Sequence, residues 1–169
     1  MRAVICKSFG PPETLELSEV DDLTPGKGQV RVAVEACGVN FPDTLIIENK
    51  YQFKPDLPFA PGGEVAGVVD AIGEGVTSAK VGDRVMVMTL HGGFAEQIVV
   101  DASALLPRPA SMPGDVAAGF TMTYGTSMHA LKQRGQLQAG ETLLVLGAGG
   151  GVGLAAVEIG KLMGAKVIA

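Results

Sequence analysis

A cluster of glycines that directly follows an apolar run constrains the fold of this chain more than any other feature. The run is Thr142–Leu146, the cluster occupies residues 147–153, and a segment with helical periodicity follows over residues 152–163. Another strand pattern begins at Lys166. A strand, a glycine-rich turn, a helix and a second strand make the βαβ unit of a doubly wound parallel α/β sheet. Because a sheet of two parallel strands would leave its faces and edges uncovered, we expect the polypeptide to continue beyond Ala169.

The glycine turn predicts a phosphate site. A phosphate can approach a backbone only where side chains are absent, and a helix that opens at about Gly151 directs N–H groups and the positive end of its dipole at such a ligand. The register reads Ala148-x-Gly150-x-x-Gly153, which is close to a dinucleotide-binding fingerprint in the required strand–turn–helix context. We predict that the pyrophosphate of a dinucleotide binds Ala148, Gly149, Gly150, Gly151, Val152 and Gly153. The alternative is a turn that is rich in glycine only for tight packing.

The first two thirds of the chain has a different character. Strand patterns cover residues 2–7, 14–20, 30–36, 64–72, 85–88 and 94–100, with a short helix over 42–48 and an irregular loop over 51–63. Short strands separated by Gly/Pro turns predict a closed or barrel-like β domain. Prolines 107, 109 and 113 mark a linker, and helices are predicted over 111–119 and 121–134. We therefore predict a β domain over residues 1–120 and the first part of a nucleotide-binding domain over 121–169.

Charge and composition exclude several classes of protein. The formal net charge is −5 and no basic patch interrupts the sequence, which argues against a nucleic-acid partner. The sequence has no run of about 18 uncharged apolar residues, so it does not predict a membrane span. Cys6 and Cys37 are the only cysteines. We expect them to be free, buried thiols, as is usual in a reducing cytoplasm.

Five motifs carry a resemblance to a known family. They are residues 36–43 (ACGVNFPD), 61–67 (PGGEVAG), 81–85 (VGDRV), 123–126 (TYGT) and 149–153 (GGGVG). In this order they resemble the medium-chain dehydrogenase/reductase superfamily, and within it the zinc-free quinone oxidoreductase (zeta-crystallin-like) branch. The resemblance implies a GroES-like β domain followed by a Rossmann domain. It also implies hydride transfer from NADPH to a quinone or an α,β-unsaturated carbonyl, and a homodimer or homotetramer when the chain is full length. From the sequence NADH is not excluded, because the residue that reads the ribose should lie about 20 positions past the glycines, just beyond Ala169.

The zinc-containing branch of the superfamily has a Cys near position 40 and a His near position 63. This sequence has Asn40 and Gly63 at those places. His91 and His129 have no ligand spacing, and no cluster of four cysteines is present. We therefore expect no metal site.

Without a metal, side-chain donors must stabilise the charge that develops on the substrate oxygen. Asn40 is the first candidate, since its amide donates without a change of proton, and the resemblance places the matching Asn beside the nicotinamide and substrate. The alternative is an Asn that caps the helix beginning near Pro42. Tyr51 is a second candidate donor, or else a loop aromatic that packs on Phe53 or Phe59.

Three further residues are less specific. The resemblance places Thr126 at the nicotinamide end of the cofactor, with Thr123 as a weaker candidate. The alternative is a helical Thr whose hydroxyl bonds an earlier carbonyl. Glu64 is expected to be structural.

A different class of function also stays open, namely a protein of the same fold that binds NADPH for structural or sensing purposes and catalyses nothing.

Overall fold

The computed structural model describes all of residues 1–169, which divide into two compact units, Met1–Gly119 and Phe120–Ala169. No helix of the structure combines the length and the apolar character that a membrane-spanning helix requires. Each unit is described below by itself.

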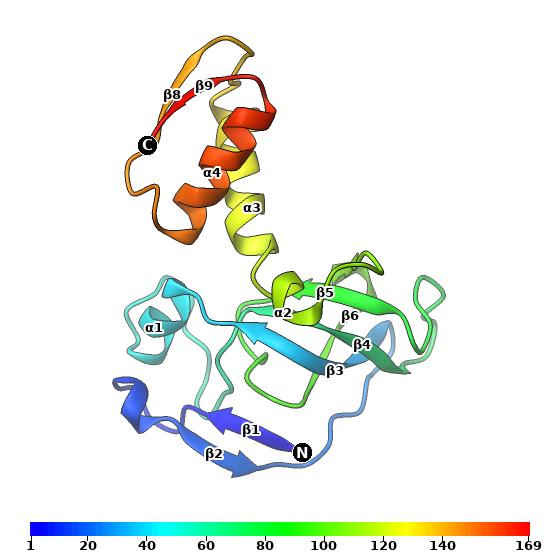
Figure 1. The fold of residues 1–169 in the computed structure, drawn as a ribbon. Helices are drawn as coiled ribbons and strands as arrows, with labels where there is room; N and C mark the ends of the chain where they lie inside the picture. The colour runs from blue at the N-terminus through cyan, green and yellow to red at the C-terminus, as the bar shows by residue number, and fades with distance from the viewer. The chain divides into compact units, whose positions relative to one another are not determined.

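The first unit is built from two antiparallel sheets (Figure 1). Strand β1 (Arg2–Ile5) pairs with β2 (Glu16–Glu19), and the single-turn helix η1 (Pro12–Thr14) lies between them. The larger sheet has the order β6-β3-β4-β5-β7. Its strands are β3 (Gln29–Gly38), β4 (Glu64–Ile72), β5 (Arg84–Met88), β6 (Gln97–Asp101) and β7 (Leu105–Pro107), with η2 (Ala102–Ala104) before the last.

The two faces of the large sheet have different roles because side chains alternate along each strand. One face carries the main core, formed by Val30, Val32, Val65, Val69, Val85, Val87 and Ile98. On the other face Ala66 and Met86 are covered by Ala117 and Ala118 at the end of α2 (Gly114–Ala117). Helix α1 (Phe41–Ile47) leaves the end of β3 and buries Ile46 and Ile47 against Cys6 and Phe59.

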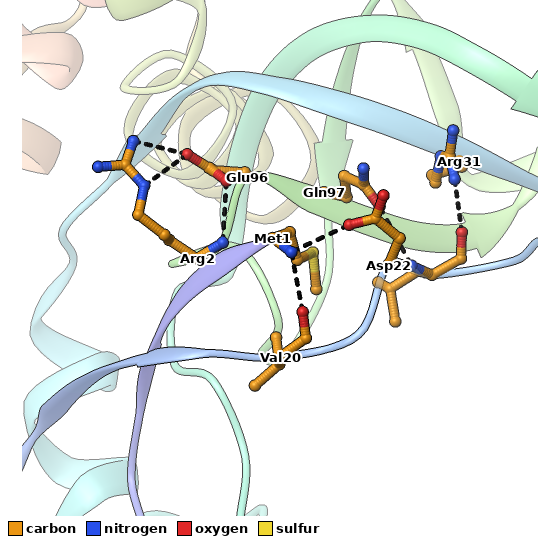
Figure 2. Close-up of polar contacts among 8 residues, drawn as sticks. Met1, Arg2, Val20, Asp22, Arg31, Glu96 and Gln97 are labelled. Atoms are coloured by element: carbon orange, nitrogen blue, oxygen red, sulfur yellow. Dashed lines mark hydrogen bonds and ion pairs between the residues drawn. The ribbon is translucent and has the colours of Figure 1, made fainter.

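Polar contacts join the first two residues of the chain to the segment after β2 and to Glu96, which directly precedes β6 (Figure 2). The Met1 amine donates to Val20 O at 2.8 Å and to the Asp22 carboxylate at 3.0 Å. Arg2 pairs with Glu96, whose carboxylate accepts both the guanidinium, at 2.6 Å, and the Arg2 backbone N–H, at 2.8 Å. These contacts fix β1 beside the segment that leads into β6.

The second unit contains one complete strand–helix–strand connection. Strands β8 (Thr142–Leu144) and β9 (Lys166–Ile168) are parallel, and α4 (Gly151–Leu162) connects them (Figure 1). Helix α3 (Thr121–Met128), which continues as one π-helical segment η3 (His129–Arg134), packs against α4. Leu144 and Ile168 of this strand pair are exposed, as is Leu146, which follows β8.

Most predicted elements are present, and three differ. The strand expected from residue 94 begins at Gln97, because residues 94–96 bond to β1 and to Pro61 instead of to β3 alone. The helix expected over 111–119 is only Gly114–Ala117. Strand β7 was missed because its proline resembles a linker residue; β7 is an edge strand, where a residue without an N–H is tolerated.

Candidate active site

Asn40 occupies the N-cap of α1, directly after β3 ends at Gly38. The Asp43 carboxylate, one turn into the helix, accepts the Asn40 backbone N–H at 2.7 Å, as in a capping box. The capping alternative therefore holds for the position of Asn40. Its side chain makes a different contact, since Asn40 Nδ2 donates to Glu64 Oε2 at 3.0 Å.

Glu64 is the most deeply buried acid of the chain, with 1% of its surface exposed. As the first residue of β4 it lies in register between Gly38 of β3 and Met88 of β5. A Cβ at Gly38 would lie 3.1 Å from Glu64 Oε2 and 2.2 Å from Ala118 O. Glycine at position 38 is therefore required mainly by the Ala118 carbonyl, and a side chain there would also crowd the Glu64 carboxylate.

Asp43 is buried beside this pair and also accepts the Gly62 N–H. Burial raises the pKa of its carboxyl group, while the two backbone hydrogen bonds act in the opposite direction. Asp43 thus connects the start of α1 to the loop before β4.

The Cys37 thiol lies in a space that two glycines keep open. A Cβ at Gly62 or Gly93 would approach Cys37 Sγ to 2.8 or 2.6 Å. Burial raises the pKa of the thiol to about 12, so it stays protonated at neutral pH. Both cysteines are free, as expected; Cys6 is buried, whereas Cys37 is half-buried.

The Tyr51 ring packs on the cluster that contains Phe59, as the packing alternative supposed. Its hydroxyl makes no hydrogen bond, and none joins it to Asn40. Phe53 stacks on His91 with ring centroids 5.8 Å apart, and Phe59 meets the same imidazole edge-on at 5.9 Å. Burial lowers the pKa of His91. The loop therefore places the half-buried Tyr51 ring against the cluster that includes Ile46 and Ile47 of α1.

In the second unit, the backbone conformation or the packing of the chain itself requires glycine at three positions of the turn. Gly147 has φ +70°. A Cβ at Gly153 would lie 2.2 Å from Gly147 O, and one at Gly151 would lie 2.9 Å from the Thr123 methyl group. These contacts let strand, turn and helix pack closely.

Neither conformation nor packing requires glycine at position 149. A Cβ there would meet nothing within 4 Å, and its φ is not positive. The hydrogen bonds of the turn run from Gly150 N–H to Gly147 O and from Leu154 N–H to Gly150 O, and none uses the N–H of Gly151, Val152 or Gly153. Beside the turn lies an open hollow of about 580 Å³. It is lined by four glycines and Val152 of the turn, by Leu131 of η3, by residues 143–146 and by Ala156 of α4. An open side, unused amides and a helix N-terminus fit a pyrophosphate.

Helix α3 supports this turn through one residue that the sequence did not reveal. Ser127 is buried, and its hydroxyl donates to Val152 O at 2.7 Å. Thr123 places its methyl group against Gly151 and donates its hydroxyl to Phe120 O at 3.4 Å. Thr126 is exposed, and its hydroxyl group makes no hydrogen bond. Ser127 carries no motif signal; only its burial and its partner identify it.

No group of three or more His, Cys, Asp and Glu side chains comes together in the way that metal ligands would.

Comparison with known proteins agrees with this geometry. Residues 26–110 match the alcohol dehydrogenase GroES-like domain. A quinone oxidoreductase-like protein 2 homolog of Nematostella vectensis is 44% identical over 169 residues, which cover 99% of this chain and 46% of that relative. The crystal structure of a probable oxidoreductase from Mycobacterium abscessus superposes with a TM-score of 0.93 at 46% identity, covering 100% of this chain and 54% of the other. A quinone oxidoreductase from Thermus thermophilus, solved also in its complex with NADPH, gives 0.86 at 36% identity, over 99% of this chain and 52% of the other.

The chain therefore contains a GroES-like domain of the alcohol dehydrogenase type. The chain belongs to the medium-chain dehydrogenase/reductase superfamily, in its quinone oxidoreductase branch. The predicted family and fold class are confirmed. The chain spans about half the length of the relatives it matches.

Proposed function

We propose that the protein to which this chain belongs is an NADPH-dependent oxidoreductase that reduces a quinone or an α,β-unsaturated carbonyl without zinc. The observation that carries the proposal is the open side of Gly149 beside three unused backbone amides at the start of α4. The names of the relatives, and the NADPH complex of the Thermus thermophilus enzyme, support it.

We further propose that the two parts of the chain divide the work. Residues 1–120 would form the substrate domain, and residues 121–169 would begin the cofactor domain. The division of the chain into compact units at Gly119 and Phe120 is compatible with this assignment.

The turn from Ala148 to Gly153 would hold the pyrophosphate through backbone N–H groups, with Thr123 and Thr126 of α3 toward the rest of the cofactor. When bound, NADPH supplies the hydride. The chain itself contributes orientation, and Ser127 holds the first turn of α4 in place through its bond to Val152 O.

Reduction of a conjugated carbonyl places negative charge on its oxygen. Asn40 would donate an N–H to that oxygen, because Nδ2 has two N–H groups and Glu64 accepts one of them. Tyr51 would be a second donor through its free hydroxyl group. In this proposal the two donors do the work that zinc does in the metal-containing branch.

The test uses the full-length protein and follows NADPH consumption with a small quinone and with an enone. We expect turnover with at least one acceptor. Asn40→Ala and Tyr51→Phe should lower kcat, the first by about 100-fold, in the range measured for loss of an oxyanion donor. Thr44→Ala, in the same helix but outside the site, is the control.

If NADPH binds and neither acceptor is reduced, the protein is a non-enzymatic NADPH-binding member of the family. If both variants keep full activity, Asn40 and Tyr51 are not the donors.

A further inference from the structure

We propose that Glu64 is a positioning residue of the reaction: its buried carboxylate sets the orientation of the Asn40 amide, so that one N–H group remains to donate to the acceptor oxygen. The inference rests on the proposed function and adds a residue and a physical role to it.

The chemistry of the pair decides which end of the amide faces inward. An Asn side chain can rotate by 180° and exchange its oxygen for its nitrogen with little change in shape. An ionised carboxylate only accepts hydrogen bonds. With Oε2 of Glu64 at 3.0 Å, the nitrogen of Asn40 must face it, because the reverse orientation would set two oxygens against each other.

The surroundings hold both partners in place. Glu64 is 1% exposed and is paired through β4 to a strand on each side. A side chain at position 38 would crowd the carboxylate, since its Cβ would lie 3.1 Å from Glu64 Oε2. The Asn40 backbone is fixed separately by the Asp43 carboxylate. Asn40 is thus held both at its backbone and at its side-chain nitrogen. Preorganised donors of this kind are effective in catalysis because they need no reorientation during the reaction.

Two substitutions perturb this arrangement in different ways. Glu64→Gln keeps the shape, but its own amide can present either end, so Asn40 is no longer restricted to one orientation. Asn40→Asp places a carboxylate against the buried carboxylate of Glu64, which is unfavourable for both. Combining them, Asn40→Asp with Glu64→Gln, restores a hydrogen bond with its direction reversed, but position 40 then has no N–H to offer.

The test measures kcat, the KM for a quinone, NADPH affinity and melting temperature for the full-length protein, the two single variants and the double variant. We expect Glu64→Gln to lower kcat by about tenfold through loss of orientation, with NADPH affinity changed less than about twofold. The double variant should regain the melting temperature that Asn40→Asp loses, while kcat stays low.

A reversed pair as active as the wild type would overturn the proposal, because the side chain at position 40 would then not need to donate. Wild-type kcat in Glu64→Gln would do the same. An NMR signal from the Asn40 side-chain amide, assigned by its loss in Asn40→Asp, reports orientation without activity. We expect two well-separated NH₂ protons in the wild type and altered, closer shifts in Glu64→Gln.

The two proposals fail in different ways. A wild-type protein that reduces no acceptor contradicts the proposed function, and the role of Glu64 in the reaction falls with it. An active enzyme whose Asn40 amide signal does not respond to Glu64→Gln contradicts the positioning role alone.

Discussion

The Asn40 region and the glycine turn are built on opposite principles. Around Asn40, specific side chains contact one another or the backbone. The Asn40 amide donates to the buried Glu64 carboxylate, and the buried Asp43 carboxylate accepts two backbone N–H groups. At residues 147–153 the site is made of backbone, and the side chains are important mainly because they are absent. The first region depends on which atoms are present, and the second depends on which volumes are empty.

The same contrast extends over the two units. The first unit also buries Arg108, whose side chain is 0% exposed and whose Nη1 donates to Glu35 at 2.6 Å. Its Nε and Nη2 atoms are buried and have no partner. Substitutions in the first unit should therefore act through unsatisfied polar groups, and those in the turn through steric overlap.

The largest effect should come from Gly153→Ala. Its Cβ would overlap Gly147 O at 2.2 Å and Ala148 Cα at 2.8 Å, both backbone atoms that cannot rotate away. We expect the unfolding free energy to fall by about 3 kcal/mol, at the upper end for overpacking. We also expect NADPH binding to be lost. Urea denaturation measures the loss, and Gly150→Ala is the control, because its nearest atom lies at 3.6 Å. Equal stability of the two variants would contradict the steric account.

The Arg108–Glu35 pair should respond unequally to loss of its members. Glu35→Ala leaves a fully buried guanidinium unpaired and should cost about 3 kcal/mol. Arg108→Met removes the buried charge and its orphan donors, while Glu35, 42% exposed, can be hydrated; we expect a cost below about 1 kcal/mol. Chemical denaturation of both variants measures this. A larger cost for Arg108→Met would show that the aliphatic packing of the arginine, and not its charge, is what stabilises this unit.

Ser127→Ala should have a smaller effect, because Val152 O keeps its place in the α4 ladder when the hydroxyl group is lost. We expect about 1 kcal/mol, the usual value of one hydrogen bond, and weaker NADPH binding with little change in kcat. Ser127→Thr, which keeps the hydroxyl group, should recover part of the binding. A variant with unchanged affinity would remove Ser127 from the support of the turn.

The smallest effect concerns pH. The hydrogen bond from Arg108 lowers the pKa of Glu35 below its ordinary value of 4.5. A lowered pKa means that this stabilisation is fully present above pH 4.5 and is lost as pH falls through the folded-state value. Unfolding free energies measured across this range should fall less steeply for Glu35→Gln than for the wild type. Parallel curves would mean that other carboxylates determine the acid sensitivity.

These two regions also differ in how far the sequence predicts them. Strand β4 and strand β9 lie where the patterns place them, and the glycine turn is readable because its strand, turn and helix are neighbours in the chain. The partner of Asn40 is 24 residues away and that of Glu35 is 73 residues away. Periodicity indicates which face a residue occupies but not which distant residue it meets there, so Glu64 was recognised only as structural.

The proposed function depends on the turn at residues 147–153 holding the pyrophosphate of NADPH. The most direct measurement is a calorimetric titration of NADPH into full-length wild type and Gly149→Ala, with melting temperatures recorded for both. Since the added methyl group meets no atom of the chain within 4 Å, we expect an unchanged melting temperature. The Kd should rise by about tenfold or more, which corresponds to about 1.4 kcal/mol of lost binding free energy. An equal Kd for the two proteins would contradict the claim.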